Sequence, residues 1–257
     1  MVKLSVCIEM ILREQPFLDR IDAVADAGYP AFEFWRWSGK DIEGILRKKR
    51  KYGLAVSVFG VDPMGGIANI DTKDTFLKGI QDSIEVAHKL ECPSLLVTVG
   101  NEIEAVPRRR QHDNVVECLR LAAPLVEKAH ITLALEPLNI LVDHKGYYLS
   151  TSSEGFEILR EVNSPNVKLL YDIYHMQIME GNLIDTITKN IGSIGHFHVA
   201  DVPGRHEPGT GEINYANVFS KIDEAGYKGY VGLEFRPLAD SREALRTVLG
   251  IATANRS

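Results

Sequence analysis

Residues 167–199 read VKLLYDIYHMQIMEGNLIDTITKNIGSIGHFHV, and this stretch contains the unit from which the fold follows. Two short apolar runs, 167–172 and 194–199, flank a segment at 183–191 whose apolar residues recur at helical spacing. Runs this short and this rich in Val, Ile, Leu and Phe are typical of strands that are buried on both faces. Strands joined through a helix lie parallel, with a right-handed crossover. The stretch therefore predicts a strand–helix–strand unit.

The same alternation of apolar runs and amphipathic segments extends along the rest of the chain. The predicted strands are residues 4–10, 31–35, 54–61, 94–99, 131–136, 167–172, 194–199 and 230–235. The predicted helices are residues 16–27, 41–52, 72–90, 114–129, 152–162, 183–191, 215–225 and 241–254. Gly28, Gly53 and Gly226 each follow one of these helices directly, where a left-handed residue is favoured.

Eight strand–helix units in 257 residues predict an α/β fold of the (β/α)₈ TIM barrel type. The chain has no linker rich in proline or serine, so we expect a single domain over residues 1–257. A doubly wound open sheet is the alternative. It is less favoured because no G-x-G-x-x-G motif follows the first predicted strand.

Composition and charge exclude several classes of protein. The chain is 45% hydrophobic and 25% charged, which is ordinary for a globular protein. Its net charge of −6 argues against nucleic acid or an anionic membrane surface as a partner. No apolar run approaches the ~20 residues of a membrane helix, and we expect no signal peptide. Three scattered cysteines favour reduced thiols and a cytoplasmic location.

Ionisable residues end four consecutive predicted strands, and strand alternation gives their direction. In residues 131–136, Ile, Leu and Leu share one face, so Glu136 points into the barrel; the same alternation turns Asp172, His198 and Glu234 inward. Three converging carboxylates repel each other and are costly to bury, unless a cation compensates them. Three carboxylates with one imidazole suit Mg²⁺, Mn²⁺ or Co²⁺. The sequence therefore predicts a divalent metal or acid–base site at these strand ends.

Each candidate also has a plain structural interpretation. A single acid at a strand end is more often a helix cap or an ion-pair partner, and His196, one layer deeper than His198, is by itself more often a core histidine. The loop 200–213 offers Arg205 as a clamp for a carboxylate or phosphate, and its length is typical of a lid or binding loop. Glu33, Trp35 and Trp37 are candidates either for the pocket wall or for packing. The loop 62–71 is a candidate flap.

Several motifs, taken together, identify a family. They are LEPLN at 135–139, YDIYH at 171–175, GHFHVAD at 195–201, GR at 204–205, PGTGEINY at 208–215 and GLE at 232–234. In this order and with this spacing, they resemble the xylose isomerase-like TIM barrel family. The resemblance extends over essentially the whole chain and is densest between residues 136 and 237.

The resemblance implies roles for individual residues. Glu136 and Glu234 match the paired proton donor and acceptor of the family, and with Asp172 and His198 they match the positions that hold a divalent metal in the epimerase members. His175 and Arg205 match residues that contact substrate in those members. We expect Asn139 and His196 to complete the substrate-binding set.

Within the family, the resemblance is strongest to members that interconvert hydroxypyruvate and tartronate semialdehyde through an enediolate. Isomerases of 2-oxo-tetronate and ketose 3-epimerases are the nearest alternatives. In the epimerases a second acid closely follows the strand-end glutamate, whereas here residues 140–142 are apolar and the first acid is Asp143, which favours a short substrate.

More distant alternatives are a lyase like inosose dehydratase, a metal-dependent nuclease like endonuclease IV, and a non-catalytic binding subunit. The nuclease reading requires more histidine ligands and a basic cleft. We expect a small-molecule substrate, and homodimers or homotetramers are common among enzymes of this size.

Overall fold

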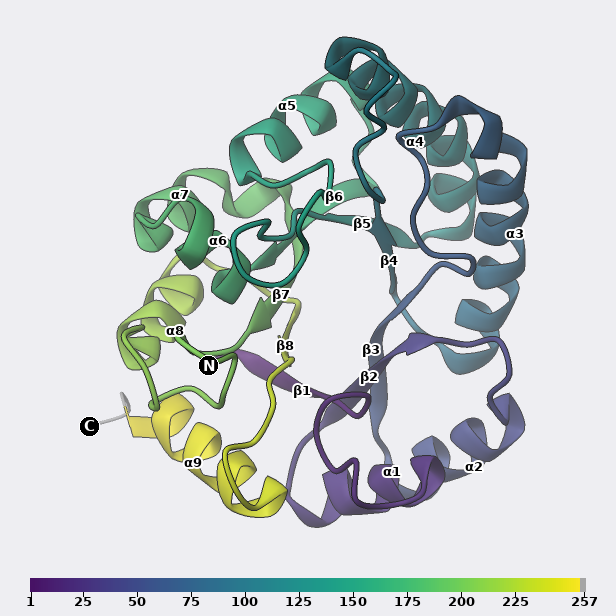
Figure 1. Cartoon of the computed structure of the whole chain (residues 1–257). Helices are drawn as coiled ribbons and strands as arrows, with labels where there is room; N and C mark the ends of the chain where they lie inside the picture. The colour runs from purple at the N-terminus through teal and green to yellow at the C-terminus, as the bar shows by residue number, and fades with distance from the viewer. Residues whose placement is uncertain (255–257) are drawn as a thin grey trace.

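The apolar runs form parallel strands that close into a barrel in residues 1–254, the part of the chain that this computed structural model describes (Figure 1). Each strand pairs with the next along the chain, and β8 pairs with β1 to close the ring. The strands are β1 Lys3–Cys7, β2 Ala31–Arg36, β3 Ala55–Gly60, β4 Ser94–Thr98, β5 Thr132–Glu136, β6 Val167–Asp172, β7 Ile194–Val199 and β8 Tyr230–Leu233. The predicted (β/α)₈ TIM barrel is confirmed.

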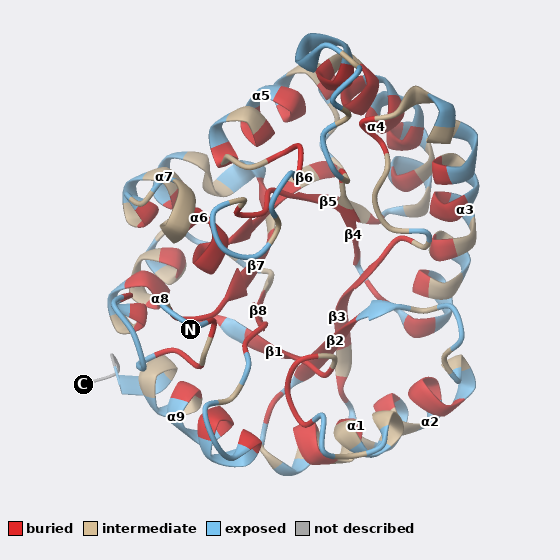
Figure 2. Cartoon of the chain, viewed as in Figure 1, coloured by how far each residue is buried: buried red, intermediate tan, exposed pale blue. Residues whose placement is uncertain are grey.

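Helices surround the barrel and turn their apolar faces toward it (Figure 2). They are α1 Phe17–Asp26, α2 Ile42–Tyr52, α3 Lys73–Leu90, α4 Arg108–Ala129, α5 Ser152–Val162, α6 Ile173–Met179, α7 Leu183–Asn190, α8 Tyr215–Glu224 and α9 Ser241–Thr253, with short 3₁₀ turns η1 Ile70–Thr72 and η2 Ile191–Ser193. None of the helices in residues 1–254 combines the length and the apolar content needed to cross a membrane.

Local chemistry fixes where several helices begin and end. The Asp41 carboxylate accepts a hydrogen bond from the Gly44 backbone amide at 2.8 Å, which satisfies a free donor at the start of α2. Gly28, Gly53 and Gly226 have φ values of 80°, 66° and 81°, so the predicted left-handed positions are confirmed.

Two helices differ from the sequence prediction, and strand β1 ends at Cys7 rather than at residue 10. Helix α4 begins at Arg108 rather than at residue 114, because its first turns are polar and gave no apolar periodicity to detect. Helix α6 begins directly after β6, in a segment without a predicted helix. Asp172 is its N-cap and accepts from the His175 amide at 3.0 Å. The seven residues of α6 are too few to show a periodicity.

The hydrophobic core has two parts. The larger part lies between the outer face of the barrel and the helices. The smaller part fills the barrel with Val58, Leu96, Ala134 and Leu170, against which Met64 packs. Ala134 lies two residues before Glu136 and so shares its face of β5; its position in this inner cluster confirms the alternation that directs Glu136 inward. The inner cluster thus forms an apolar floor on one side of the barrel mouth.

Candidate active site

The carboxyl ends of β5 to β8 bring together the four ionisable residues singled out by the sequence. Glu136 and Asp172 are the last residues of β5 and β6, His198 is next to last in β7, and Glu234 directly follows β8. All four side chains are buried, and one potential ligand atom from each lies within 4.8 Å of the others. Strand register contributes to this, because Asp172 pairs with His198 and His198 pairs with Gly232.

His198 lies among the carboxylates. Its Nδ1 atom is 3.2 Å from Glu136 Oε1 and 3.6 Å from Glu234 Oε2. Burial by itself would lower the pKa of His198, but Glu234 and Glu33 raise it well above its usual value. Burial raises the pKa of Glu136 to about 7; His198 opposes this shift, and the charges of Glu234 and Asp172 add to it. Glu136 can therefore hold or release a proton near neutral pH.

Glu234 accepts hydrogen bonds on both oxygens. Trp35 Nε1 donates to Oε1 at 2.7 Å, and Arg205 Nη2 donates to Oε2. The Arg205 guanidinium also lies within 4.0 Å of Asp172 Oδ2, so one cation faces two carboxylates of the cluster. Arg205 has a φ of 60°, a left-handed conformation that a non-glycine residue rarely adopts without support from the surrounding structure.

The loop that carries Arg205 is held by one buried acid. Asp201 Oδ1 accepts from the Val202 and Ile213 amides at 2.9 and 3.1 Å, and Oδ2 accepts from the Gly209 amide at 2.9 Å. The Asp201 side chain is fully buried, so it supports the loop rather than facing the pocket. The loop 200–213, whose length and Arg205 suggest a lid or binding loop from the sequence, is therefore folded around the Asp201 carboxylate.

His175 is neutral and has a defined tautomer. Its Nδ1 atom accepts from the Asn139 side-chain amide at 2.7 Å and from the Asn139 backbone amide at 3.2 Å, so the proton sits on Nε2. Nε2 lies 3.5 Å from Asp172 Oδ2. Burial, followed by the charge of Arg205, lowers the pKa of His175 well below its usual value. Asn139 thus orients His175 so that an N–H points toward the cluster.

A cavity of about 610 Å³ opens at these strand ends. Glu136, Glu234 and Arg205 line it, whereas His175, Asn139 and His196 are fully buried beside it. The contacts of the latter three with substrate stay predictions. Apolar wall residues are Met10, Trp35, Met64, Leu96 and Leu138, and the remaining cations are Arg36, Lys40 and Arg236.

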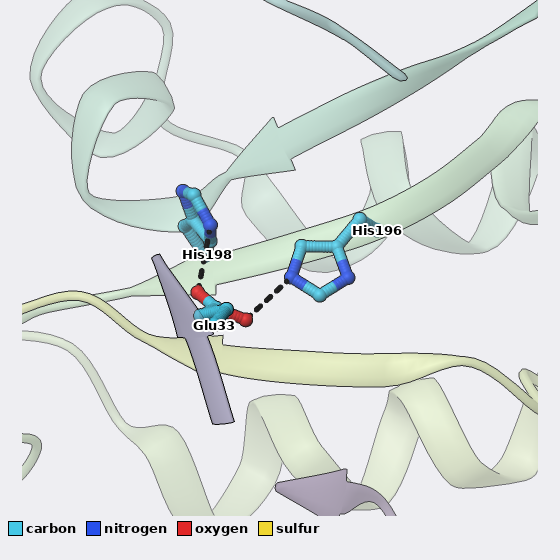
Figure 3. A group of neighbouring side chains, drawn as sticks. All are labelled: Glu33, His196 and His198. Carbon is cyan, nitrogen blue, oxygen red and sulfur yellow. Dashed lines mark hydrogen bonds and ion pairs between the residues drawn. The ribbon is translucent and has the colours of Figure 1, made fainter. Parts of the chain in front are cut away.

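Two residues near the site were left undecided by the sequence. Glu33 is buried and faces His198 (Figure 3). Trp35 donates a hydrogen bond to Glu234. Phe32 and Phe34 belong to the core outside the barrel, so the alternation used for the other strands would have turned Glu33 and Trp35 inward. Trp37 instead donates to Ser83 Oγ at 2.9 Å and is a packing residue.

The donor set of the four-residue cluster fits a divalent cation. Oxygen-rich sites with one imidazole suit Mg²⁺, Mn²⁺ or Co²⁺. Burial is the main cause of the raised pKa of Glu136, and the charges of Glu234 and Asp172, which add to it, are charges that a cation would offset.

Comparison with known proteins extends over nearly the whole chain. Residues 21–249 match the model of the xylose isomerase-like TIM barrel family. Hydroxypyruvate isomerase of Escherichia coli K12 is 34% identical over 96% of this chain and 98% of its own length. A 2-oxo-tetronate isomerase of Pectobacterium atrosepticum is 31% identical over 95% of this chain and 96% of its own length.

Solved structures give the same picture of the fold. The crystal structure described as an AP endonuclease, family 2, from Brucella melitensis superposes with a TM-score of 0.93 at 30% identity, over 97% of this chain and 98% of that one. The 3-keto-D-glucoside 4-epimerase YcjR from E. coli superposes with a TM-score of 0.86 at 23% identity, over 99% of this chain and 100% of that one, and this likeness concerns the fold alone.

Proposed function

The chain belongs to the xylose isomerase-like TIM barrel family, and on that premise we propose that it is an isomerase of the hydroxypyruvate isomerase type. Such an enzyme interconverts hydroxypyruvate and tartronate semialdehyde. One proton leaves C3 and one arrives at C2, while the hydroxyl proton moves from the oxygen on C3 to the oxygen on C2. The reaction needs proton-transfer groups beside the two carbons and positive charge where the enediolate oxygen develops.

The pair of buried glutamates on the cavity wall carries this proposal. Glu136 and Glu234 converge on His198 from β5 and β8, and both face the cavity. We assign them the two proton transfers at carbon, each acting as base in one direction and as acid in the other. Arg205, fixed on Glu234, supplies positive charge at the cavity wall, and the Nε2–H of His175 is a donor for a substrate oxygen.

We propose that Glu136, Asp172, His198 and Glu234 hold a divalent cation, Mg²⁺, Mn²⁺ or Co²⁺. When bound, such an ion polarises a substrate carbonyl as a Lewis acid. The chain's own contribution is to keep these donors buried and oriented. Arg205 limits the negative charge of the cluster whether or not the ion is bound.

The charge of the cavity rim supports a substrate that carries a carboxylate. Arg36 and Arg236 are exposed cavity residues, and neither forms an ion pair within residues 1–254. Lys40, in contrast, is paired with Glu9 at 2.6 Å. We propose that Arg36 and Arg236 attract the carboxylate of a short keto acid, which favours hydroxypyruvate or 2-oxo-tetronate over a neutral ketose.

We further propose a cytoplasmic location, because Cys7, Cys92 and Cys118 are free and buried, as suits a reducing compartment. A homodimer or homotetramer stays a prediction, which light scattering of the purified protein would test.

Substrate specificity and two substitutions test the function. We expect hydroxypyruvate or 2-oxo-tetronate to be isomerised, neutral ketoses to react poorly, and EDTA to abolish turnover. Glu136→Gln and Glu234→Gln should each lower kcat by at least about 10²- to 10⁴-fold, the usual contribution of general acid–base catalysis. Glu157→Gln, on the exposed face of α5, is the control. Full activity in either cavity variant would refute the assignment, and preferential turnover of ketoses would indicate an epimerase.

A further inference from the structure

Glu33 faces both His196 and His198 (Figure 3), and His198 is also a member of the proposed cation site. The Glu33 carboxylate is 2% exposed and lies inside the barrel. Glu33 Oε1 is 3.0 Å from His198 Nε2, and Oε2 is 3.1 Å from His196 Nε2. Ser57 Oγ also donates to Oε2 at 2.8 Å, and it lies 2.6 Å from Ser5 Oγ. Side chains from β1, β3 and β7 therefore surround one carboxylate from β2.

The chemistry of these groups determines how His198 is oriented. An ionised carboxylate only accepts hydrogen bonds, so the histidine nitrogens that face it carry hydrogen. Two imidazole nitrogens and the Ser57 hydroxyl face the two Glu33 oxygens, and each of these three groups can donate to them. His198 Nε2 and Glu33 Oε1 form an ion pair that departs from ideal hydrogen-bond alignment. Within residues 1–254 neither of these buried atoms has a hydrogen-bond partner, and the 3.0 Å ion pair joins them to each other.

Placing the Nε2 proton against Glu33 leaves the opposite ring nitrogen for the cation. When a neutral imidazole carries hydrogen on Nε2, the lone pair is on Nδ1. His198 Nδ1 is the atom that faces Glu136 and Glu234. A carboxylate behind a ligating histidine fixes the tautomer and the ring orientation, and makes the ring a stronger ligand.

The barrel leaves room for this carboxylate at one position. A Cβ atom built on Gly232 would lie 2.3 Å from Glu33 Oε1 and 2.6 Å from Oε2. Glycine at 232 is therefore what allows the Glu33 side chain to lie against β8. Ser57 and His196 contact the other oxygen, Oε2, so the Glu33 carboxylate is held from two sides.

We propose that Glu33 is a positioning residue that holds His198 with Nδ1 directed at the cation. This inference rests on the cation site proposed above. The alternative is that Glu33, His196 and His198 bind a second ion themselves, since their potential ligand atoms also lie within 4.8 Å. The observed pairing favours positioning, because each Glu33 oxygen already faces one histidine nitrogen and Oε2 also receives the Ser57 hydroxyl.

Metal titration of Glu33→Gln tests the proposal. The variant keeps the size of the side chain and removes its charge, so we expect the dissociation constant for Mn²⁺, measured calorimetrically on metal-free protein, to rise about 10- to 100-fold. Electron spin-echo spectroscopy of the Mn²⁺ form should show a weakened ¹⁴N coupling from His198. Glu9→Gln is the matched control, because it also removes one negative charge near the cavity, from a residue that pairs with Lys40 and not with His198. We expect its dissociation constant for Mn²⁺ to stay within about twofold of the native value.

The outcomes separate this inference from the function on which it rests. If the native protein binds one Mn²⁺ and Glu33→Gln binds it equally well, the positioning role is refuted and the proposed function stands. Two Mn²⁺ per chain, with one lost in Glu33→Gln, would identify a second metal site and overturn the proposal. Absence of Mn²⁺ binding in the native protein would overturn the cation site and this inference together. Should Glu33→Gln fail to fold, Ser57→Ala retains Glu33 but removes a donor to it, and we then expect an affinity about 3- to 10-fold weaker, half the effect of Glu33→Gln on a logarithmic scale.

Discussion

Replacing Gly232 by alanine would introduce one methyl group at the most crowded point of the barrel interior. The new Cβ would lie 2.3, 2.6 and 2.7 Å from Glu33 Oε1, Oε2 and Cδ. Glu33 cannot retreat easily, because Ser57 and His196 hold its other side. Overpacking of this kind typically costs about 1 to 3 kcal/mol. Because buried polar contacts are also disturbed, we expect the upper part of that range, about 2 to 3 kcal/mol in the free energy of unfolding.

Urea unfolding followed by circular dichroism measures this loss, which corresponds to about 30- to 150-fold in the folding equilibrium. Gly192→Ala is the control: a Cβ there meets no atom within 4 Å, so we expect a change below about 0.5 kcal/mol. In combination with Glu33→Ala, the cost of Gly232→Ala should largely disappear, giving a coupling of at least about 1 kcal/mol. Strict additivity, or a fully stable Gly232→Ala protein, would refute the reasoning.

Three further predictions concern other parts of the molecule. Trp35→Phe removes the donor to Glu234 Oε1 and should lower kcat/KM about tenfold, equivalent to about 1.4 kcal/mol, with unchanged melting temperature; an unaltered steady-state rate would contradict the role of this hydrogen bond. Asp201→Ala removes the acceptor for three loop amides and should destabilise the protein by at least about 2 kcal/mol in urea unfolding, whereas an effect below 0.5 kcal/mol would show that the loop is held by other contacts. Burial raises the pKa of the Cys7 thiol, and raises those of Cys92 and Cys118 to about 12 and about 11, so a thiol reagent at pH 8 should label the native protein slowly and the urea-unfolded protein fully. Because the folded pKa values exceed the unfolded value, the free energy of unfolding should also fall as pH rises from 9 to 12. Rapid labelling of the native protein would contradict this prediction.

The sequence was sufficient to predict the barrel and the convergence of the four strand-end groups. The barrel follows from the eight repeated strand–helix units. The convergence follows from period-two alternation, which holds along buried strands regardless of tertiary detail. Ala134 and Glu136 lie on the predicted inner face of β5, and strand register then places Asp172 beside His198.

The remaining features depend on contacts between distant segments. Glu33 was considered as an isolated residue, and its partners on β3 and β7 are brought to it only by closure of the barrel. Asp172 is both the N-cap of helix α6 and a predicted metal ligand. Strand alternation gives the direction of its side chain but does not show that a helix begins at the next residue. The loop 200–213 depends on Asp201, whose amide partners lie up to 12 positions away.

Closure of the ring through β1 and β8 has a consequence for biosynthesis. The first strand finds its second neighbour only at the far end of the chain, and a nearby contact, from the Leu12 amide to Ser241 Oγ, joins residues 229 positions apart. During translation the early strands emerge with one edge unpaired, and such edges are prone to misassembly and aggregation. Glu234 is also among the last site residues to leave the ribosome. The barrel and the four-residue cluster are therefore complete only after β8 and Glu234 have been synthesised.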